Sequence, residues 1–156
     1  MIESIKIIGT VQKITEYSNG TKEIVEFPNT ILKKGREALA KSLANEVGDS
    51  YPFFVNRMLF GDGGTVDGTI KHIDTQRNGL FGITRSSKPV ISQVDSDNPN
   101  RVIFTSVLSN SDANGYALNE MALQMKNGDF YSMVTFPDLN KTSEMQITYN
   151  WSISFF

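Results

Sequence analysis

Cysteine is absent from the chain. Its absence excludes disulfide bonds, thiolate metal sites and a cysteine nucleophile. A chain of 156 residues is long enough to bury a core without such cross-links, and its composition suits folding in a reducing cytosol.

Long apolar runs and an excess of positive charge are also missing. No stretch approaches the roughly 20 apolar residues of a membrane helix. Residues 1–10 carry the acidic Glu3 and no long apolar run, so we expect no signal peptide. Lys and Arg number 15 against 17 Asp and Glu, giving a net charge of -2. This balance gives no basic surface for displacing counterions, so we expect neither membrane insertion nor specific nucleic-acid binding.

Residues for catalysis are scarce. The single histidine, His72, lies in a polar segment where solvent exposure is its ordinary state, and a histidine-rich metal site is excluded. No serine lies in a Gly-x-Ser-x-Gly elbow, and the carboxylates are scattered. We therefore predict that the protein is not an enzyme and needs no cofactor. A small hydrolase whose carboxylates converge on folding stays open as an alternative.

The C-terminal segment, in contrast, alternates strictly. Over residues 145–155 every odd position is apolar and every even position is polar. Such a period of two indicates a β-strand with one face on a core. The aromatic residues of its apolar face, Tyr149, Trp151 and Phe155, are expected in the core.

Two Asn-Gly pairs predict β-hairpins. Asn19-Gly20 separates the β-prone runs 4–17 and 21–27, and Asn127-Gly128 separates 117–125 from 130–136. Both residue types tolerate the positive φ of tight turns. In the run 117–125, Glu120 falls on the polar face. Further strands are expected over residues 53–60, 79–84, 89–94 and 101–108, the last of them buried on both faces.

One helix is predicted near residues 31–47, where leucines recur at about helical spacing. Thr30 is its expected N-cap, and Gly35 would permit close backbone packing. Turn residues recur about every 8 to 12 positions elsewhere, which favours antiparallel sheets. The whole chain, 1–156, is therefore predicted to be one mainly β domain, an antiparallel β-sandwich or barrel-like fold with one inserted α-helix.

The loop 110–115 approaches a calcium-loop pattern. Asn110, Asp112 and Asn114 alternate as ligand positions would, but the position of the bidentate glutamate holds Met121. Turn preferences explain the same residues. We therefore expect no metal ion and keep the three residues as calcium candidates.

Candidate contacts with other subunits lie in two places. Tyr51, Phe53 and Phe54 follow the predicted helix and are not clearly internal. Asn150 and Ser152 lie on the polar side of the closing strand, whose side chains carry no charge. Edge strands and the loop 65–78 are further means of reaching a neighbour.

Several short motifs occur together along the chain. They are Phe27-Pro28-Asn29, Leu32-x-x-Gly35-Arg36-Glu37-x-Leu39-Ala40, Gly61-Asp62-Gly63-Gly64, Leu118-Asn119-Glu120-x-Ala122-Leu123, Asn127-Gly128-Asp129-Phe130-Tyr131-Ser132, Lys141-Thr142 and Trp151-x-Ile153-x-Phe155. With them the chain resembles small structural proteins of tailed bacteriophage particles, from the neck, collar, tail and fibre-attachment regions.

The resemblance implies a virion component, made in the host cytoplasm, that works through contacts with other virion proteins. It further implies a homo-oligomer in a symmetric assembly, with no catalytic residues. The alternative is a fibre or baseplate module that recognises host-surface carbohydrate, and it would require exposed aromatic rings or loop carboxylates.

Overall fold

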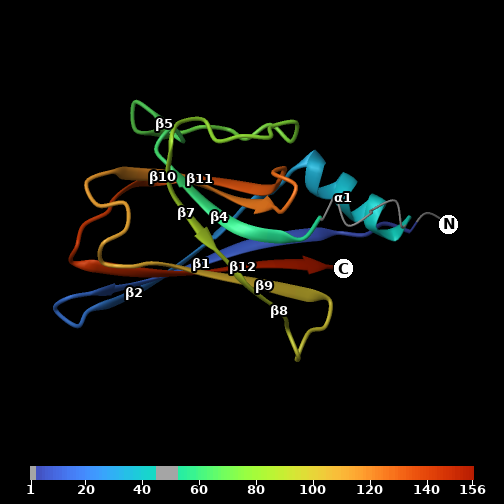
Figure 1. Ribbon diagram of the computed structural model, residues 1–156, viewed down its shortest axis with the longest axis horizontal. Helices are drawn as coiled ribbons and strands as arrows, with labels where there is room; N and C mark the ends of the chain where they lie inside the picture. The colour runs from blue at the N-terminus through green and yellow to red at the C-terminus, as the bar shows by residue number, and fades with distance from the viewer. Residues whose placement is uncertain (1–2, 45–52) are drawn as a thin grey trace.

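Two five-stranded antiparallel sheets face each other across an apolar core in the computed structural model, which describes residues 3–44 and 53–156. Figure 1 shows the two layers, with the single helix at one end. Sheet A contains, in order, β2 (Lys22–Pro28), β1 (Ile7–Tyr17), β12 (Met145–Phe155), β9 (Arg101–Leu108) and β8 (Ile91–Val94). Sheet B contains β3 (Thr30–Ile31), β11 (Phe130–Asn140), β10 (Ala117–Met125), β4 (Val55–Gly61) and β7 (Thr84–Pro89). The prediction of a mainly β, antiparallel sandwich with one helix is confirmed.

The closing strand β12 is central in sheet A. It pairs with β1 on one side and β9 on the other, and its odd residues face sheet B. Ile147, Tyr149, Trp151 and Ile153 are buried there. The rings of Phe60 and Tyr149 meet at 5.1 Å between centroids, which joins the two sheets.

Both predicted hairpins form, as β1–β2 and β10–β11. In the first, the N–H of Gly20 donates to the carbonyl of Tyr17, and that of Tyr17 donates to the carbonyl of Thr21. Only Gly20 has positive φ, at 88°, so Asn19 does not use the left-handed region. Its side chain instead accepts the N–H of Thr21 at 2.9 Å, as Asn commonly does in turns.

The helix α1 (Lys33–Leu43) is shorter than predicted. Thr30 and Ile31 form β3, because they pair with Met133 and Ser132 of β11. Leu32 therefore precedes the helix, and no side chain caps it. The predicted residues 45–47 lie outside the described residues. A Cβ on Gly35 would lie 2.6 Å from the carbonyl oxygen of Tyr131, so this glycine permits the close packing of α1 on β11.

Two predictions about strands were wrong. The polar residues 85–88, which separate the predicted strands 79–84 and 89–94, form the middle of β7, an edge strand whose side chains need no core, and residues 79–83 belong to no strand. The strand buried on both faces is β10 rather than β9. One face of β9 carries Val107, which is 38% exposed.

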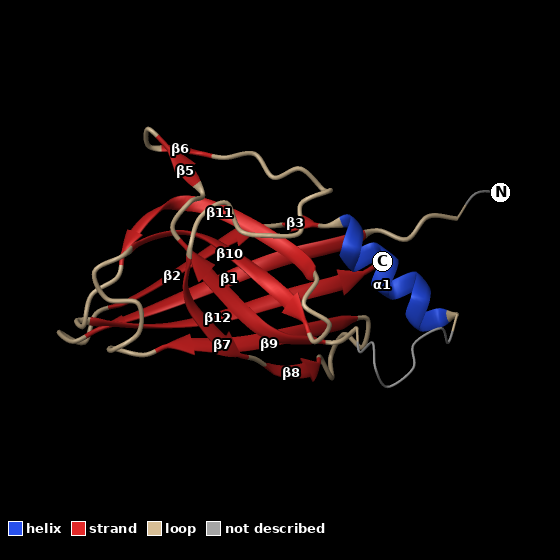
Figure 2. Cartoon of the chain, turned by 45° about the horizontal axis from the view of Figure 1, so that its top comes forward, coloured by secondary structure: helices blue, strands red, loops and turns tan. Residues whose placement is uncertain are grey.

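The second face of β10 is covered by a long connection between β4 and β7, residues 62–83, here called the strap. It includes the small hairpin of β5 (Thr65–Val66) and β6 (Thr69–Ile70) and crosses sheet B on the side away from sheet A (Figures 1 and 2). Ile73, Leu80 and Phe81 of the strap pack on an apolar cluster of the sheet that includes Leu59 and Ala122. The strap gives sheet B a second apolar layer, which leaves sheet A as the sheet with the more open outer face.

Candidate assembly surfaces

The outer face of sheet A holds Asn150 and Ser152, two of the predicted contact residues. Both are partly exposed. Asn150 sits in a chain of side-chain hydrogen bonds across three strands. The hydroxyl of Thr105 donates to its Oδ1 at 2.9 Å, and its Nδ2 donates to Oε1 of Gln12 at 3.0 Å. The centre of the face, along β12 and its direct neighbours, is thus made of ordered, uncharged hydrogen-bonding groups.

A shallow hollow of about 400 Å³ lies over this chain of hydrogen bonds. Its lining is mostly Thr, Gln, Asn and Ser, with Ile91 and Ile103 as aliphatic members and Glu26 as the carboxylate. Ile91 is 76% exposed. Uncharged polar groups beside exposed aliphatic ones are easily desolvated, so this surface suits contact with another molecule.

The described aromatic contact candidates, Phe53 and Phe54, differ in their exposure. Tyr51 lies outside the described residues. Phe53 packs against the core, whereas Phe54 is 60% exposed. Both line a cavity of about 340 Å³ at one end of the sandwich, together with apolar residues of both sheets.

The strap is fastened by two residues of β10. Glu120 is fully buried, and its carboxylate accepts the backbone N–H groups of Gly63, Phe81 and Gly82 at 3.0, 2.7 and 2.9 Å. Asn119 accepts the N–H of Gly64 at 2.7 Å. Alternation places Glu120 on a polar face, but the strap encloses that face and supplies backbone N–H donors to the carboxylate oxygens.

Charged groups hold the start of the strap from outside. The Asp62 carboxylate accepts from Nε of Arg85 at 2.6 Å, and the guanidinium lies 4.3 Å from the centre of the Tyr116 ring. Hydrogen bonds from Asn119 and Thr65 lower the pKa of Asp138, so this carboxylate is charged at neutral pH. The Gly61-Asp62-Gly63-Gly64 motif is therefore the anchored start of the strap.

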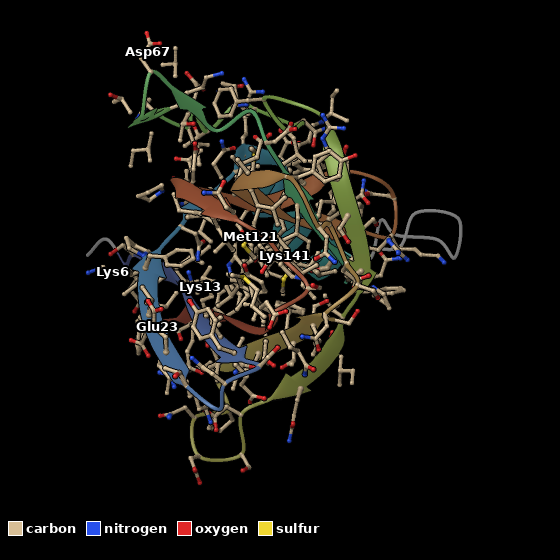
Figure 3. The ribbon with its side chains drawn as sticks, turned by 90° about the vertical axis from the view of Figure 1, so that its left-hand side faces the viewer. Lys6, Lys13, Glu23, Asp67, Met121 and Lys141 are labelled. Carbon is tan, nitrogen blue, oxygen red and sulfur yellow. The ribbon has the colours of Figure 1, made fainter. Side chains whose placement is uncertain are left out.

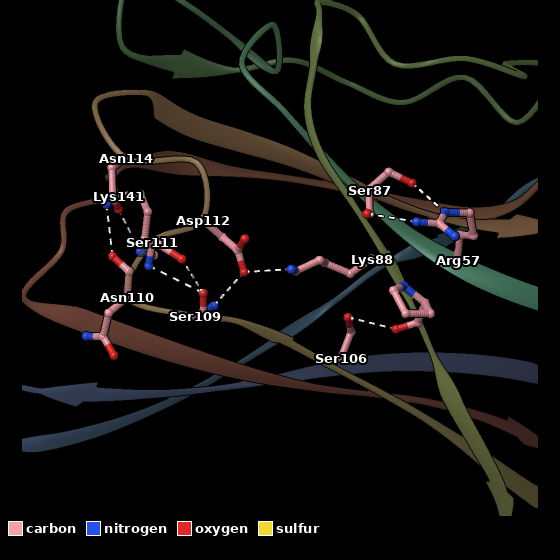
Figure 4. Close-up of polar contacts among 11 residues, drawn as sticks. Arg57, Ser87, Lys88, Ser106, Ser109, Asn110, Ser111, Asp112, Asn114 and Lys141 are labelled. Atoms are coloured by element: carbon pink, nitrogen blue, oxygen red, sulfur yellow. Dashed lines mark hydrogen bonds and ion pairs between the residues drawn. The ribbon is translucent and has the colours of Figure 1, made fainter.

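Two of the three calcium candidates, Asp112 and Asn114, contact lysine ammonium groups (Figure 4). Nζ of Lys88 lies 2.7 Å from the Asp112 carboxylate, which also accepts the N–H of Ser109 at 2.8 Å. Burial raises the pKa of Asp112, but these hydrogen bonds outweigh it and hold the pKa below its usual range. Nζ of Lys141 donates to Oδ1 of Asn114 at 3.0 Å. Asn110 instead donates through Nδ2 to the carbonyl of Ser143.

Lys141, directly after β11, is the most enclosed cation in this group, at 1% exposure, and in the end-on view of Figure 3 it lies between the two layers. Burial lowers its pKa, and the charge of Asp112 opposes that shift. Two lysines thus occupy positions beside the oxygens that a calcium ion would require. The pattern of Asn and Asp in the sequence did not reveal these lysines, because Lys88 lies on β7 and Lys141 directly after β11, both outside the loop 110–115.

No catalytic constellation links these groups. His72 is exposed on the strap. Within residues 3–44 and 53–156, no three His, Cys, Asp or Glu side chains gather as a metal site. In the same residues, no helix combines the length and apolar composition that crossing a membrane requires.

Comparison with known proteins gives one match. The family described as phage tail-collar fibre protein, N-terminal, matches residues 25–153. No curated protein and no solved structure matches the chain.

Proposed function

The chain belongs to the phage tail-collar fibre protein family, as an N-terminal domain, and from this premise we propose that it builds the neck, collar or tail through subunit contacts in a symmetric assembly. The family supports a structural role in the phage tail and association with other virion proteins. In this role the chain works through contacts with other subunits and not through catalysis.

The observation that carries this proposal is the outer face of sheet A. Its central strand β12 presents uncharged side chains there, and aliphatic residues of the neighbouring strands remain exposed, namely Ile8, Ile24, Ile91 and Val107. Covering such uncharged groups with another protein costs less hydration free energy than covering charged groups would.

Purified tails of a phage encoding this chain test the role. We expect the chain in the particle, and we expect Ser152→Lys to reduce its incorporation because an ammonium group would be buried at the contact. Asn98→Lys is the matched control, since Asn98 is exposed in the turn between β8 and β9. Absence of the chain from particles contradicts the role, and equal incorporation of both variants contradicts the assignment of this face.

Recognition of host-surface carbohydrate is the second candidate, and the hollow on sheet A favours it. The amides of Gln12, Gln93 and Asn150 line the hollow, and amides can bond sugar hydroxyls. A glycan array tests this function. Binding that Gln93→Ala abolishes supports it, and an array without binding removes it.

A further inference from the structure

The strand β2 forms an open edge of sheet A. It pairs with β1, and no strand among residues 3–44 and 53–156 pairs with its outer side. All of its residues except Phe27 are exposed, and Ile24 is exposed at 56%. Figure 3 shows Glu23 on this strand, at the rim of the sandwich. An open edge of this kind offers unpaired backbone groups to another strand.

The hairpin bonding identifies which backbone groups are unpaired. The N–H of Tyr17 donates to the carbonyl of Thr21 at 2.9 Å, and these residues continue the β1–β2 register. Backbone groups alternate in direction along a strand, so odd residues of β2 face β1. Lys22, Ile24 and Glu26 therefore direct their N–H and C=O groups toward the open side.

The same three residues are self-complementary in charge. If two β2 strands pair antiparallel about a two-fold axis at Ile24, Lys22 lies opposite Glu26 of the second copy, and Glu26 lies opposite its Lys22. Ile24 meets Ile24. Each opposed pair can exchange two backbone hydrogen bonds. All these side chains lie on the outer face of sheet A, since they are in register with the outward residues of β1.

Two-fold axes at other residues of β2 give less favourable charge pairing or backbone hydrogen bonding. An axis at Glu23 or Glu26 opposes two like carboxylates, which is unfavourable across a strand pair. An axis at Val25 places Lys22 opposite Pro28, which has no N–H to donate. Charge and backbone bonding thus select the axis at Ile24.

The other sheet edges lack this complementarity. β7 carries only the cations Arg85 and Lys88, so its antiparallel self-pairing gains no ion pair. β8 has 4 residues and β3 has 2, which are short for a stable pairing. Among the edges that the structure describes, β2 alone combines length with opposite charges.

We propose that β2 pairs antiparallel with β2 of a second copy of this chain, about a two-fold axis at Ile24, so that two copies of sheet A form one continuous sheet. This surface rests on the proposed structural function and names one partner for it. The pairing covers Ile24 and places the two outer faces of sheet A side by side.

Cysteine cross-linking tests the register, because the chain has no cysteine of its own. Directly opposed, hydrogen-bonded residues lie about 5.5 Å apart at Cα, within disulfide range. We expect Ile24→Cys to give a covalent dimer under mild oxidation. Ile91→Cys, at the opposite edge and more exposed, is the matched control and should stay monomeric. Absence of the Ile24→Cys dimer, or equal dimer from both variants, overturns the pairing.

Charge exchange gives an independent readout in sedimentation equilibrium. Lys22→Glu would oppose two pairs of carboxylates and raise the dimer dissociation constant about tenfold. Adding Glu26→Lys should restore association, whereas Lys126→Glu makes the same charge change on an exposed residue away from β2 and should leave it unchanged. A wild-type monomer, or no rescue, overturns the pairing. If the chain is nevertheless present in tails, the structural function stands while the pairing fails. If the chain dimerises but is absent from tails, the pairing stands while the structural function fails.

Discussion

Glu120 is a buried carboxylate whose partners are backbone N–H groups of the strap, namely those of Gly63, Phe81 and Gly82. Its carboxylate is the acceptor of three directed hydrogen bonds. Each donor would lose its acceptor at a partly buried site if the carboxylate were removed. Glu120 is therefore one of the main contacts that hold the strap on sheet B.

We expect Glu120→Ala to lower the free energy of unfolding by about 3 kcal/mol, because three backbone donors lose their acceptor and a buried side chain is truncated. Glu120→Gln keeps the shape and should cost about half as much. Urea unfolding measures both changes, and Glu144→Ala, which removes an exposed carboxylate, should change stability by less than about 0.5 kcal/mol. Equal values for Glu120→Ala and Glu144→Ala contradict this role.

Tyr149 represents the opposite case, a buried polar group without a partner. Its side chain is fully buried, and its hydroxyl has no hydrogen-bond partner among the described residues. Burial raises its pKa above the ordinary value. The neutral phenol therefore contributes stability that is fully present below about pH 10 and is lost as the pH rises further.

Tyr149→Phe should remove both the unpaired hydroxyl from the core and the loss of stability at high pH that follows from the raised pKa. At neutral pH we expect the free energy of unfolding to stay the same or rise by about 1 kcal/mol, since an unpaired hydroxyl leaves the core. Between about pH 9 and about pH 11, stability should fall less in the variant than in the wild type. Urea unfolding at both pH values measures the difference. Parallel losses in the two proteins would show that another group controls the alkaline response.

At the scale of elements, sequence patterns predicted the strands and hairpins whose pattern involves residues close together in the chain. The alternation over 145–155 identified β12, and Asn19-Gly20 and Asn127-Gly128 identified two hairpins. The same alternation on β12 correctly separated Asn150 and Ser152 from the core. Each of these features depends on residues close together in the chain.

Elements whose environment comes from distant residues were not predictable in this way. Burial of the second face of β10 depends on the strap, which lies far from it in sequence. The polar strand β7 has no apolar period because it sits at an edge of sheet B. The alternation of Lys22, Ile24 and Glu26 is visible in the sequence, but its importance depends on β2 lying at an edge.

The strap gives a testable case at this scale. A Cβ on Gly63 would collide with the backbone of Gly82, whereas a Cβ on Gly79 would meet no atom within 4 Å. We expect Gly63→Ala to destabilise by about 2 kcal/mol through overpacking and to expose the strap to proteases. Gly79→Ala should be neutral or slightly stabilising. Urea unfolding and limited proteolysis compare them, and equal behaviour would show that the contact at Gly63 is not needed.

For the molecule as a whole, sheets A and B depend on one shared core. Trp151 of sheet A and Phe60 of sheet B belong to the same buried cluster, and the C-terminal strand β12 lies between β9 and β1, a strand from near the N-terminus. Neither sheet would keep its apolar face covered if the other unfolded. We infer from this that residues 1–156 form a single cooperative domain.

Coincident unfolding transitions test this inference, because Trp151 is the one tryptophan of the chain and is fully buried. Its fluorescence reports the core, while far-ultraviolet circular dichroism reports both sheets. We expect the two signals to change together in urea and on heating. At roughly 0.7 kcal/mol per residue, the unfolding enthalpy should be about 110 kcal/mol and should equal the van't Hoff value. Separate transitions would mean that part of the chain unfolds independently of the core around Trp151.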